Sequence, residues 1–214
     1  MARISYFRIY YHVINIGIHK FLGYLLRSRF EKEKQVKETL ASYDDALGKC
    51  RDLFLKKTKD YGASWRIMRT SSVTDQLYIK ASRIRSLEEN EVQKIQEGVE
   101  PEYIGLVNYS IMALIQLDLG PSEKPDLDKN TLQKLYDKHA EITRQLMIAK
   151  NHDYGEAWRQ MRISSITDLI LVKLLRVRQI EDNEGRTIVS EGLDANYQDI
   201  INYSLFALIK LEEE

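Results

Sequence analysis

Two pairs of basic residues, Lys80 with Arg83 and Lys173 with Arg176, stand at helical spacing among apolar residues. The apolar stripes around them are formed by Val73, Leu77, Ile84 and Leu87 and by Ile166, Ile170, Val177 and Ile180. Each lysine falls on its stripe, and each arginine follows three residues later beside it on the helix surface. Because a buried cation without a partner is costly, these four side chains must meet carboxylates or line a cleft that receives an anion.

Two hypotheses therefore stay open for the four cations. One is an internal salt-bridge lattice with Asp60, Asp75, Glu88 and their counterparts in the second half of the chain. The other is a phosphate-binding pocket, in which the cations neutralise phosphate charge.

Carboxylates also recur three residues apart, at spacings that place two of them on one face of a helix. The candidates for holding Mg²⁺ and activating water are Glu88, Glu91, Glu102, Glu181, Glu184 and Asp199. Mg²⁺ binds carboxylate, water and phosphate oxygens, which such helices can supply. Gly105 and Asn196 interrupt the matching Glu-x-x-Asp pair, so that each half keeps one of its two acids. For Glu88 and Glu91 alone, a solvated helix end is the better interpretation.

A turn motif containing aromatic residues occurs twice, as Asp60-Tyr61-Gly62 followed by Trp65 and as Asp153-Tyr154-Gly155 followed by Trp158. The aromatics can cap a helical core or stack on a base, and the aspartates can bond to the amides of the turn. Asn108 and Asn202 fall on the inward side of a later helix, where an amide satisfies a neighbouring helix or binds the edge of a ligand. Beside these structural roles, the residues of the turns and the two asparagines are candidates for nucleotide binding, together with the four cations.

The elements that would position these residues are duplicated. Residues 43–90 align with residues 136–183 without a gap, and residues 97–117 align with residues 191–211 after one insertion. The Gly- and Pro-containing segment of residues 120–125 joins the copies. The repeats are thus predicted at residues 33–119 and 128–214.

Each copy is predicted to form three helices, and no stretch alternates as a strand would. In the first copy the first helix covers about residues 33 to 59, the second begins at Ser72-Val73-Thr74-Asp75 with a serine cap, and the third begins near Pro101 or Glu102. In the second copy the equivalent serine cap is predicted at Ser165-Ile166-Thr167-Asp168. Gly62 is expected to stop the first helix. We predict an all-α fold in which the two repeats pack as one pseudo-twofold bundle.

The composition excludes several classes. The 32 basic and 32 acidic residues balance, so no clear nucleic-acid patch is indicated, and the single Cys50 excludes an internal disulfide and suits the cytoplasm. Residues 1–30 are basic and aromatic, but charges interrupt every apolar run, so no transmembrane segment is expected. We expect these residues to form a poorly packed extension outside the core, with an interfacial amphipathic helix as the alternative.

The order Lys-x-x-Asp-Tyr-Gly, Trp, Lys-x-x-Arg and Asn-Tyr, present in both copies, resembles the nucleotide modification associated domain 1 family. The resemblance implies an all-helical protein that handles nucleotides, including modified ones. The helical layout is more distantly similar to the all-α nucleoside triphosphate pyrophosphohydrolases of the MazG and dimeric dUTPase type, in which paired acids on adjacent helices hold Mg²⁺.

The leading hypothesis is a nucleotide-binding protein of nucleotide metabolism with degenerate Mg²⁺ half-sites, whose expected reaction is cleavage of a nucleoside triphosphate between its α and β phosphates. In this hypothesis the binding partner is a small-molecule nucleotide. The alternative is a non-catalytic interaction module that docks a protein or nucleic acid through the paired Asp-Tyr-Gly-x-x-Trp turns.

Overall fold

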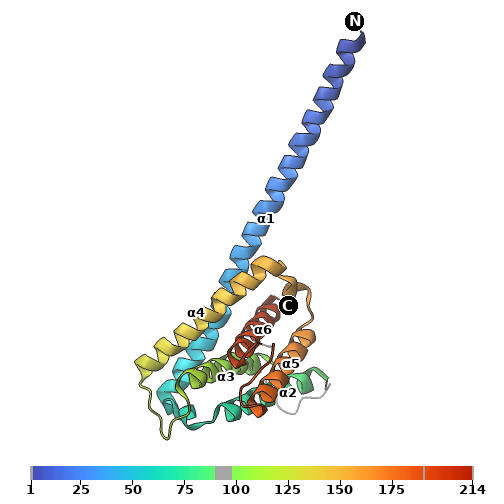
Figure 1. The fold of residues 1–214 in the computed structure, drawn as a ribbon. Helices are drawn as coiled ribbons and strands as arrows, with labels where there is room; N and C mark the ends of the chain where they lie inside the picture. The colour runs from blue at the N-terminus through green and yellow to red at the C-terminus, as the bar shows by residue number, and fades with distance from the viewer. Residues whose placement is uncertain (1, 90–97, 190, 214) are drawn as a thin grey trace. The chain divides into compact units, whose positions relative to one another are not determined.

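A computed structural model describes residues 2–89, 98–189 and 191–213, with side chains from Leu26 onward. It contains six α-helices and no strand within these ranges, so the all-α prediction is confirmed (Figure 1). The helices are α1 (Ala2–Tyr61), α2 (Thr70–Glu89), α3 (Glu100–Leu119), α4 (Lys129–Tyr154), α5 (Ile163–Asp182) and α6 (Leu193–Glu213). Two 3₁₀ turns, η1 (Ser64–Ile67) and η2 (Ala157–Gln160), precede α2 and α5.

The chain divides into two units, residues 1–42 and residues 43–214. In the first unit the described part is helical throughout, with side-chain ion pairs one turn apart such as Arg29 to Glu33 at 2.9 Å. No helix in the described part of the chain is long and apolar enough to cross a membrane.

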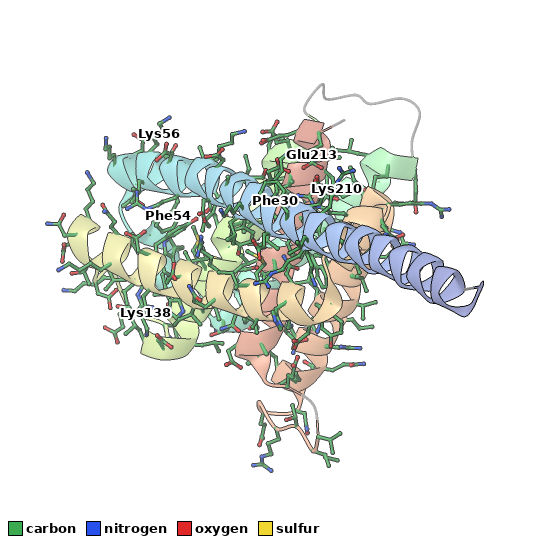
Figure 2. All side chains as sticks on the ribbon, turned by 90° about the horizontal axis from the view of Figure 1, so that it is seen from above. Phe30, Phe54, Lys56, Lys138, Lys210 and Glu213 are labelled. Carbon is green, nitrogen blue, oxygen red and sulfur yellow. The ribbon has the colours of Figure 1, made fainter. Side chains whose placement is uncertain are left out.

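The second unit is a bundle built from both repeats. Helix α3 packs on α6 and α2 packs on α5, so each helix lies against its own counterpart, while α2 with α3 and α5 with α6 pack within a repeat. Helix α4 contacts α3 and α6. On α1, Phe54, labelled in Figure 2, lies on the side of the helix toward α4. Its ring packs at a tilt against that of Tyr136 of α4, with ring centroids 4.7 Å apart. The two repeats therefore share one core, as predicted.

Several hydrogen bonds cross between the repeats in equivalent pairs, as a pseudo-twofold axis requires. Thr74 of α2 contacts Tyr197 of α6 at 2.7 Å, and its counterpart Thr167 contacts Tyr103 of α3 at the same distance. Arg51 pairs with Asp137, and the equivalent Arg144 pairs with Asp44.

The ends of the helices follow the sequence prediction only in part. Gly62 and Gly155 adopt positive φ angles of 62° and 63° after α1 and α4, which confirms the predicted stops. The predicted serine caps are wrong, because α2 begins at Thr70 and α5 at Ile163. In the second repeat the extended Arg162 is the cap residue, and its carbonyl accepts from the amides of Ser165 and Ile166.

Candidate functional site

In the first repeat, the cations of α2 bind a carboxylate from α3. Lys80 Nζ lies 3.1 Å from Glu102 Oε2, and Arg83 pairs with the other oxygen of the same carboxylate. The side chain of Glu102 is 7% exposed, whereas that of Lys80 is 24% exposed. A nearly buried acid thus holds two cations that remain partly accessible, as the spacing on α2 led us to expect.

In the second repeat, the carboxylate comes from a different position. Asp199 of α6 lies 2.6 Å from Lys173 of α5 and 2.6 Å from Lys150 of α4, one oxygen to each lysine. Arg176 is exposed and has no ion pair within the described residues. The counterpart of Glu102 is Asn196, whose amide nitrogen donates to the carbonyl of Gly192 and whose buried side-chain oxygen has no hydrogen-bond donor among the described residues.

The lattice hypothesis named other partners for these cations, and the fourth cation, Arg176, has no ion pair within the described residues. Lys80, Arg83 and Lys173 are all in ion pairs, but with Glu102 and Asp199, which the sequence had suggested as Mg²⁺ ligands. Asp75 instead pairs with Arg178 at 2.6 Å across the repeats.

The position equivalent to Asp199 is Gly105, and the two repeats differ most at this point. A Cβ atom on Gly105 would lie 2.7 Å from Lys80 Cε, so the lysine side chain fills the space of the absent side chain. Lys57, the counterpart of Lys150, has no ion pair within the described residues. In each repeat two cations therefore pair with one buried carboxylate, which stands at a different position in each repeat.

A cavity of about 220 Å³ opens beside Gly105 in the first repeat. Lys57 and Lys80 contribute to its wall, and no carboxylate does within the part of the chain that the structure describes. The other lining residues are Leu53, Phe54, Thr58, Tyr61, Gly62, Ser64, Trp65, Pro101, Gly105, Asn108, Tyr109 and Met112. The described lining thus combines aromatic surface, hydroxyl groups and two positive charges, which is a favourable environment for an anion that carries a ring.

The aromatic residues of the two turns have different surroundings. Tyr61 and Tyr154 are 70% and 75% exposed, whereas both tryptophans are buried. Trp158 stacks on Phe206 of α6 with parallel rings 4.3 Å apart. Met112 is the residue of α3 equivalent to Phe206, so the surface around Trp65 includes a flexible side chain where the second repeat has a ring.

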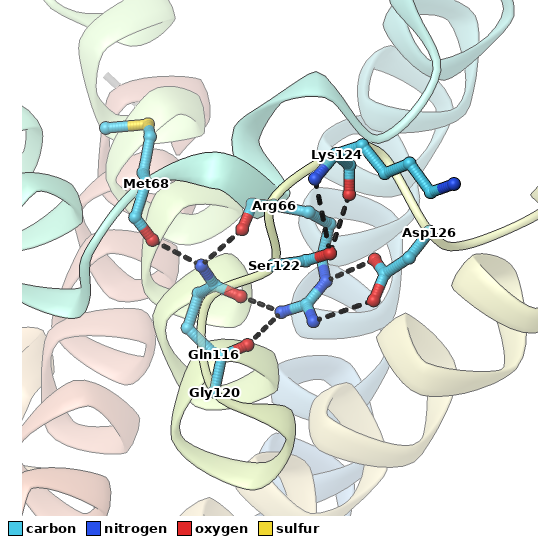
Figure 3. Close-up of polar contacts among 7 residues, drawn as sticks. All are labelled: Arg66, Met68, Gln116, Gly120, Ser122, Lys124 and Asp126. Atoms are coloured by element: carbon cyan, nitrogen blue, oxygen red, sulfur yellow. Dashed lines mark hydrogen bonds and ion pairs between the residues drawn. The ribbon is translucent and has the colours of Figure 1, made fainter.

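The turn that carries Tyr61 and Trp65 is fixed by Arg66, which is 2% exposed (Figure 3). Its guanidinium donates to Asp126 at 2.9 Å, to the carbonyl of Gly120 at 2.7 Å and to Gln116. The amide nitrogen of Gln116 donates in return to the carbonyls of Arg66 and Met68. One buried arginine therefore ties the turn to the end of α3 and to the linker before α4.

Asn108 and Asn202 have structural partners in the bundle. Tyr136 donates to Asn108 Oδ1 at 2.9 Å, and Asn108 Nδ2 donates to the carbonyl of Cys50. The equivalent Asn202 accepts from Tyr43 at 2.8 Å. Asn108 also contributes to the cavity wall, but its oxygen already has a donor from the other repeat.

Glu88 and Glu181 accept hydrogen bonds from the opposite repeat. Thr167 donates to Glu88 at 2.8 Å and Thr74 donates to Glu181 at 2.9 Å. Burial raises the pKa of both carboxyls, and the threonine hydrogen bonds oppose this shift. These acids therefore help to join the repeats.

None of the remaining predicted acids that the structure describes lines the cavity. Glu184 follows the end of α5 in an exposed loop, where it pairs with Arg186 at 3.0 Å, so it does not share a helix face with Glu181 as predicted. Glu91 lies outside the described residues. Asp60 and Asp153 are exposed, and Asp153 contacts the neighbouring His152 ring at 3.1 Å.

The described residues do not fit a Mg²⁺ site. No group of three His, Cys, Asp or Glu side chains that could hold a metal occurs in the parts of the chain that are described. Glu102 and Asp199 are both engaged by cations, which compete directly with a metal for the same oxygens. The Mg²⁺ site stays a prediction.

The sequence interpretation missed Lys57 and Lys150 as site residues. Both open the repeated Lys-x-x-Asp-Tyr-Gly motif, and Lys57 lies three residues after the buried Phe54. That spacing of three residues was the available signal, because it predicts that the side chains of Phe54 and Lys57 point toward the same face of α1.

Comparison with known proteins places the chain in a family. The model of the nucleotide modification associated domain 1 matches residues 57–117 and again residues 150–211. The protein belongs to this family and carries its domain twice. The two matches cover the turn motifs, the cation-bearing helices and the final helix of each repeat. No curated protein and no solved structure matches the chain.

Proposed function

We propose that the protein binds a nucleotide in the cavity of the first repeat, as a cytoplasmic component of nucleotide metabolism. The ring system would pack against Trp65 and Tyr61, and the phosphates would face Lys57 and Lys80. The observation that carries this proposal is a cavity wall with two lysines, several aromatic rings and, among the described residues, no carboxylate. The description of the family supports the same class of ligand.

The size of the cavity limits how a nucleotide would bind. About 220 Å³ is below the roughly 300–1,000 Å³ that encloses a drug-sized ligand. Tyr61 is 70% exposed and Lys57 is also exposed, so part of the ligand would extend past them into solvent. We therefore expect modest affinity and tolerance toward substituents on the exposed part, including modified bases.

The proposal concerns the binding of a nucleotide and does not include its hydrolysis. Hydrolysis between the α and β phosphates needs an activated water and stabilisation of developing charge. Lys57 and Lys80 could supply the charge, but no described carboxylate lines the cavity to activate water. The resemblance to all-α pyrophosphohydrolases remains a hypothesis.

A second candidate function is a non-catalytic interaction module. It is favoured by the exposure of Tyr61 and Tyr154, which project from equivalent turns at 70% and 75% exposure. The ion pairs of Lys80 and Lys173 also agree with it, because they use much of the cationic charge internally. Each turn would offer its own partner surface, because the pairs Arg51–Asp137 and Arg144–Asp44 set α1 antiparallel to α4 and the turns follow the C-terminal ends of these two helices.

Tryptophan fluorescence provides a direct test of nucleotide binding, because the chain has only Trp65 and Trp158. Trp158→Phe keeps a ring against Phe206 and leaves Trp65 as the reporter in the cavity. Titration of this variant with canonical and modified deoxynucleoside triphosphates should quench or shift its emission. The matched Trp65→Phe variant reports from Trp158 and should respond little to the same ligands.

Two outcomes would decide between the candidates. If no nucleotide changes the emission of Trp65 or raises the melting temperature, the nucleotide proposal is wrong. If Tyr61→Ala and Tyr154→Ala weaken capture of a protein or nucleic acid equally, while nucleotides have no effect, the interaction module is the better account.

A further inference from the structure

The second repeat contains its own anion in the place where the first repeat has a cavity. One oxygen of Asp199 lies 2.6 Å from Lys150 Nζ and the other lies 2.6 Å from Lys173 Nζ. The carboxylate is 8% exposed, so it is held by the bundle and not only by the lysines. A phosphate group offers oxygens that can bridge two ammonium groups in the same manner.

The first repeat has the same two lysines without the carboxylate. Lys57 and Lys80 line one cavity, and Gly105 stands at the position of Asp199. Lys80 has Glu102 as a partner, but Lys57 has no ion pair within the described residues. Glu102 is also paired with Arg83, so its carboxylate is shared between two cations and Lys57 is not one of them.

We propose that a phosphate group of the ligand bridges Lys57 and Lys80 in the first repeat, as Asp199 bridges Lys150 and Lys173 in the second. The second site is closed by its own carboxylate, and the chain binds one phosphate-bearing ligand although it carries the domain twice. The inference rests on the proposed function for its nucleotide part, while the phosphate subsite can be tested with inorganic pyrophosphate alone.

Gly105 is then the residue that keeps the site open. A Cβ atom there would lie 2.7 Å from Lys80 Cε, 2.8 Å from Cδ and 2.9 Å from Nζ. These atoms belong to the far end of a flexible side chain, which can move aside and pair with a new carboxylate as Lys173 pairs with Asp199. An aspartate at position 105 is therefore compatible with the fold, and its carboxylate would take the place of the ligand's phosphate.

Isothermal titration of the full chain with inorganic pyrophosphate, and separately with a deoxynucleoside triphosphate, tests the inference. The wild-type chain should bind one equivalent of each. Gly105→Asp should weaken both at least roughly tenfold, since charge-assisted hydrogen bonds are lost. Gly48→Asp is the matched control, because it adds the same charge on α1 where a Cβ meets nothing within 4 Å, and it should bind like the wild type.

The reciprocal variant opens the second repeat. Asp199→Gly should add a second equivalent of pyrophosphate, because Lys150 and Lys173 lose their internal anion. It should not add a second nucleotide, since the stacked pair of Trp158 and Phe206 fills the adjoining space. If this variant does not fold, Gly105→Asp and its control still decide the question.

The inference is overturned if the wild-type chain binds two equivalents, if Gly105→Asp binds pyrophosphate as the wild type does, or if a folded Asp199→Gly chain gains no second equivalent. The proposed function fails separately. Pyrophosphate binding that Gly105→Asp abolishes, without any nucleotide binding, keeps the phosphate subsite and rejects the nucleotide. Nucleotide binding that Gly105→Asp leaves unchanged keeps the nucleotide and rejects the subsite.

Discussion

The hydroxyl of Tyr43 donates to Asn202 Oδ1 at 2.8 Å, which joins the first helix of one repeat to the last helix of the other. Tyr136 and Asn108 form the reciprocal bond at 2.9 Å. All four residues are buried. Because each tyrosine satisfies the amide of the opposite repeat, neither repeat can keep its polar core paired without the other, and the duplicated domain acts as one structural unit.

Tyr43→Phe should destabilise the protein by about 1–3 kcal/mol, since the buried Asn202 oxygen loses its donor. The free energy of unfolding in urea measures the effect. Tyr154→Phe, at a position 75% exposed, is the control and should change stability by less than about 0.5 kcal/mol. Equal effects of the two variants would contradict the structural role assigned to the crossed bonds.

Arg66→Met should cost about 3 kcal/mol, because it leaves the carbonyl of Gly120 and the side chain of Gln116 without their donor. Methionine keeps much of the side-chain volume, so the effect reports lost hydrogen bonds more than a cavity. Urea unfolding provides the measurement, and the exposed Arg69→Met is the control. A stable Arg66→Met chain with unchanged nucleotide affinity would show that this arginine does not position the turn.

Much of the fold could be predicted because the sequence contains the same helical pattern in two copies. A helix boundary or an apolar stripe found in one copy is checked by the other, and the steps of three and four residues identify helices directly. The start of α5 was mistaken because Ser165 has the chemistry of a cap. The chain instead begins the helix at the carbonyl of Arg162, directly after the 3₁₀ turn. The helix and capping propensities of these residues could not show that the 3₁₀ turn η2 leads so closely into α5.

The candidate site was predicted less completely, and the reason lies in contacts between helices. Spacing along α2 placed Lys80 and Arg83 correctly, but the acid that binds them comes from α3. Periodicity fixes which face a residue occupies and not which residue stands opposite, so Glu102 and Asp199 were interpreted as metal ligands. The sequence alignment already showed that Gly105 stands at the position equivalent to Asp199. That this leaves Lys57 without a carboxylate partner could be recognised only from the arrangement of α1, α2 and α3.

Glu181→Gln should raise stability at pH 7 and have little effect at pH 4. Burial raises the pKa of Glu181 above its ordinary value of 4.5, so the folded protein binds this proton more tightly than the unfolded chain does. The penalty for the charged form is fully present above the raised pKa and disappears as the pH falls below the unfolded value. Glutamine can still accept from Thr74 without carrying a charge.

Urea unfolding at both pH values measures this difference. Glu184→Gln, whose side chain is 78% exposed in a loop, should show no comparable dependence on pH. A loss of stability in Glu181→Gln at pH 7 would mean that the carboxylate charge stabilises the bundle. Whether Glu181→Gln raises or lowers the free energy of unfolding at pH 7 therefore decides the question, even where the change is small.

Lys57 and Lys150 allow the same substitution to be compared at two equivalent positions. Lys57→Ala should leave stability within about 0.5 kcal/mol, since Lys57 has no ion pair within the described residues. Lys150→Ala should cost about 1 kcal/mol, because it removes a partner of the buried Asp199, with a discount for a lysine side chain that is 40% exposed. Binding should show the opposite pattern, with a loss of pyrophosphate and nucleotide affinity in Lys57→Ala and little change in Lys150→Ala.

Lys56→Ala is the control for charge alone, since Lys56 projects from the side of α1 opposite to Phe54 (Figure 2). It should alter neither stability nor binding. Unfolding in urea and titration calorimetry on the same three variants separate the two roles. A lysine in a closed ion pair contributes to stability, and a lysine that faces an open cavity contributes to affinity. If Lys57→Ala destabilised the chain as much as Lys150→Ala and bound ligand normally, Lys57 would be a structural residue like its counterpart.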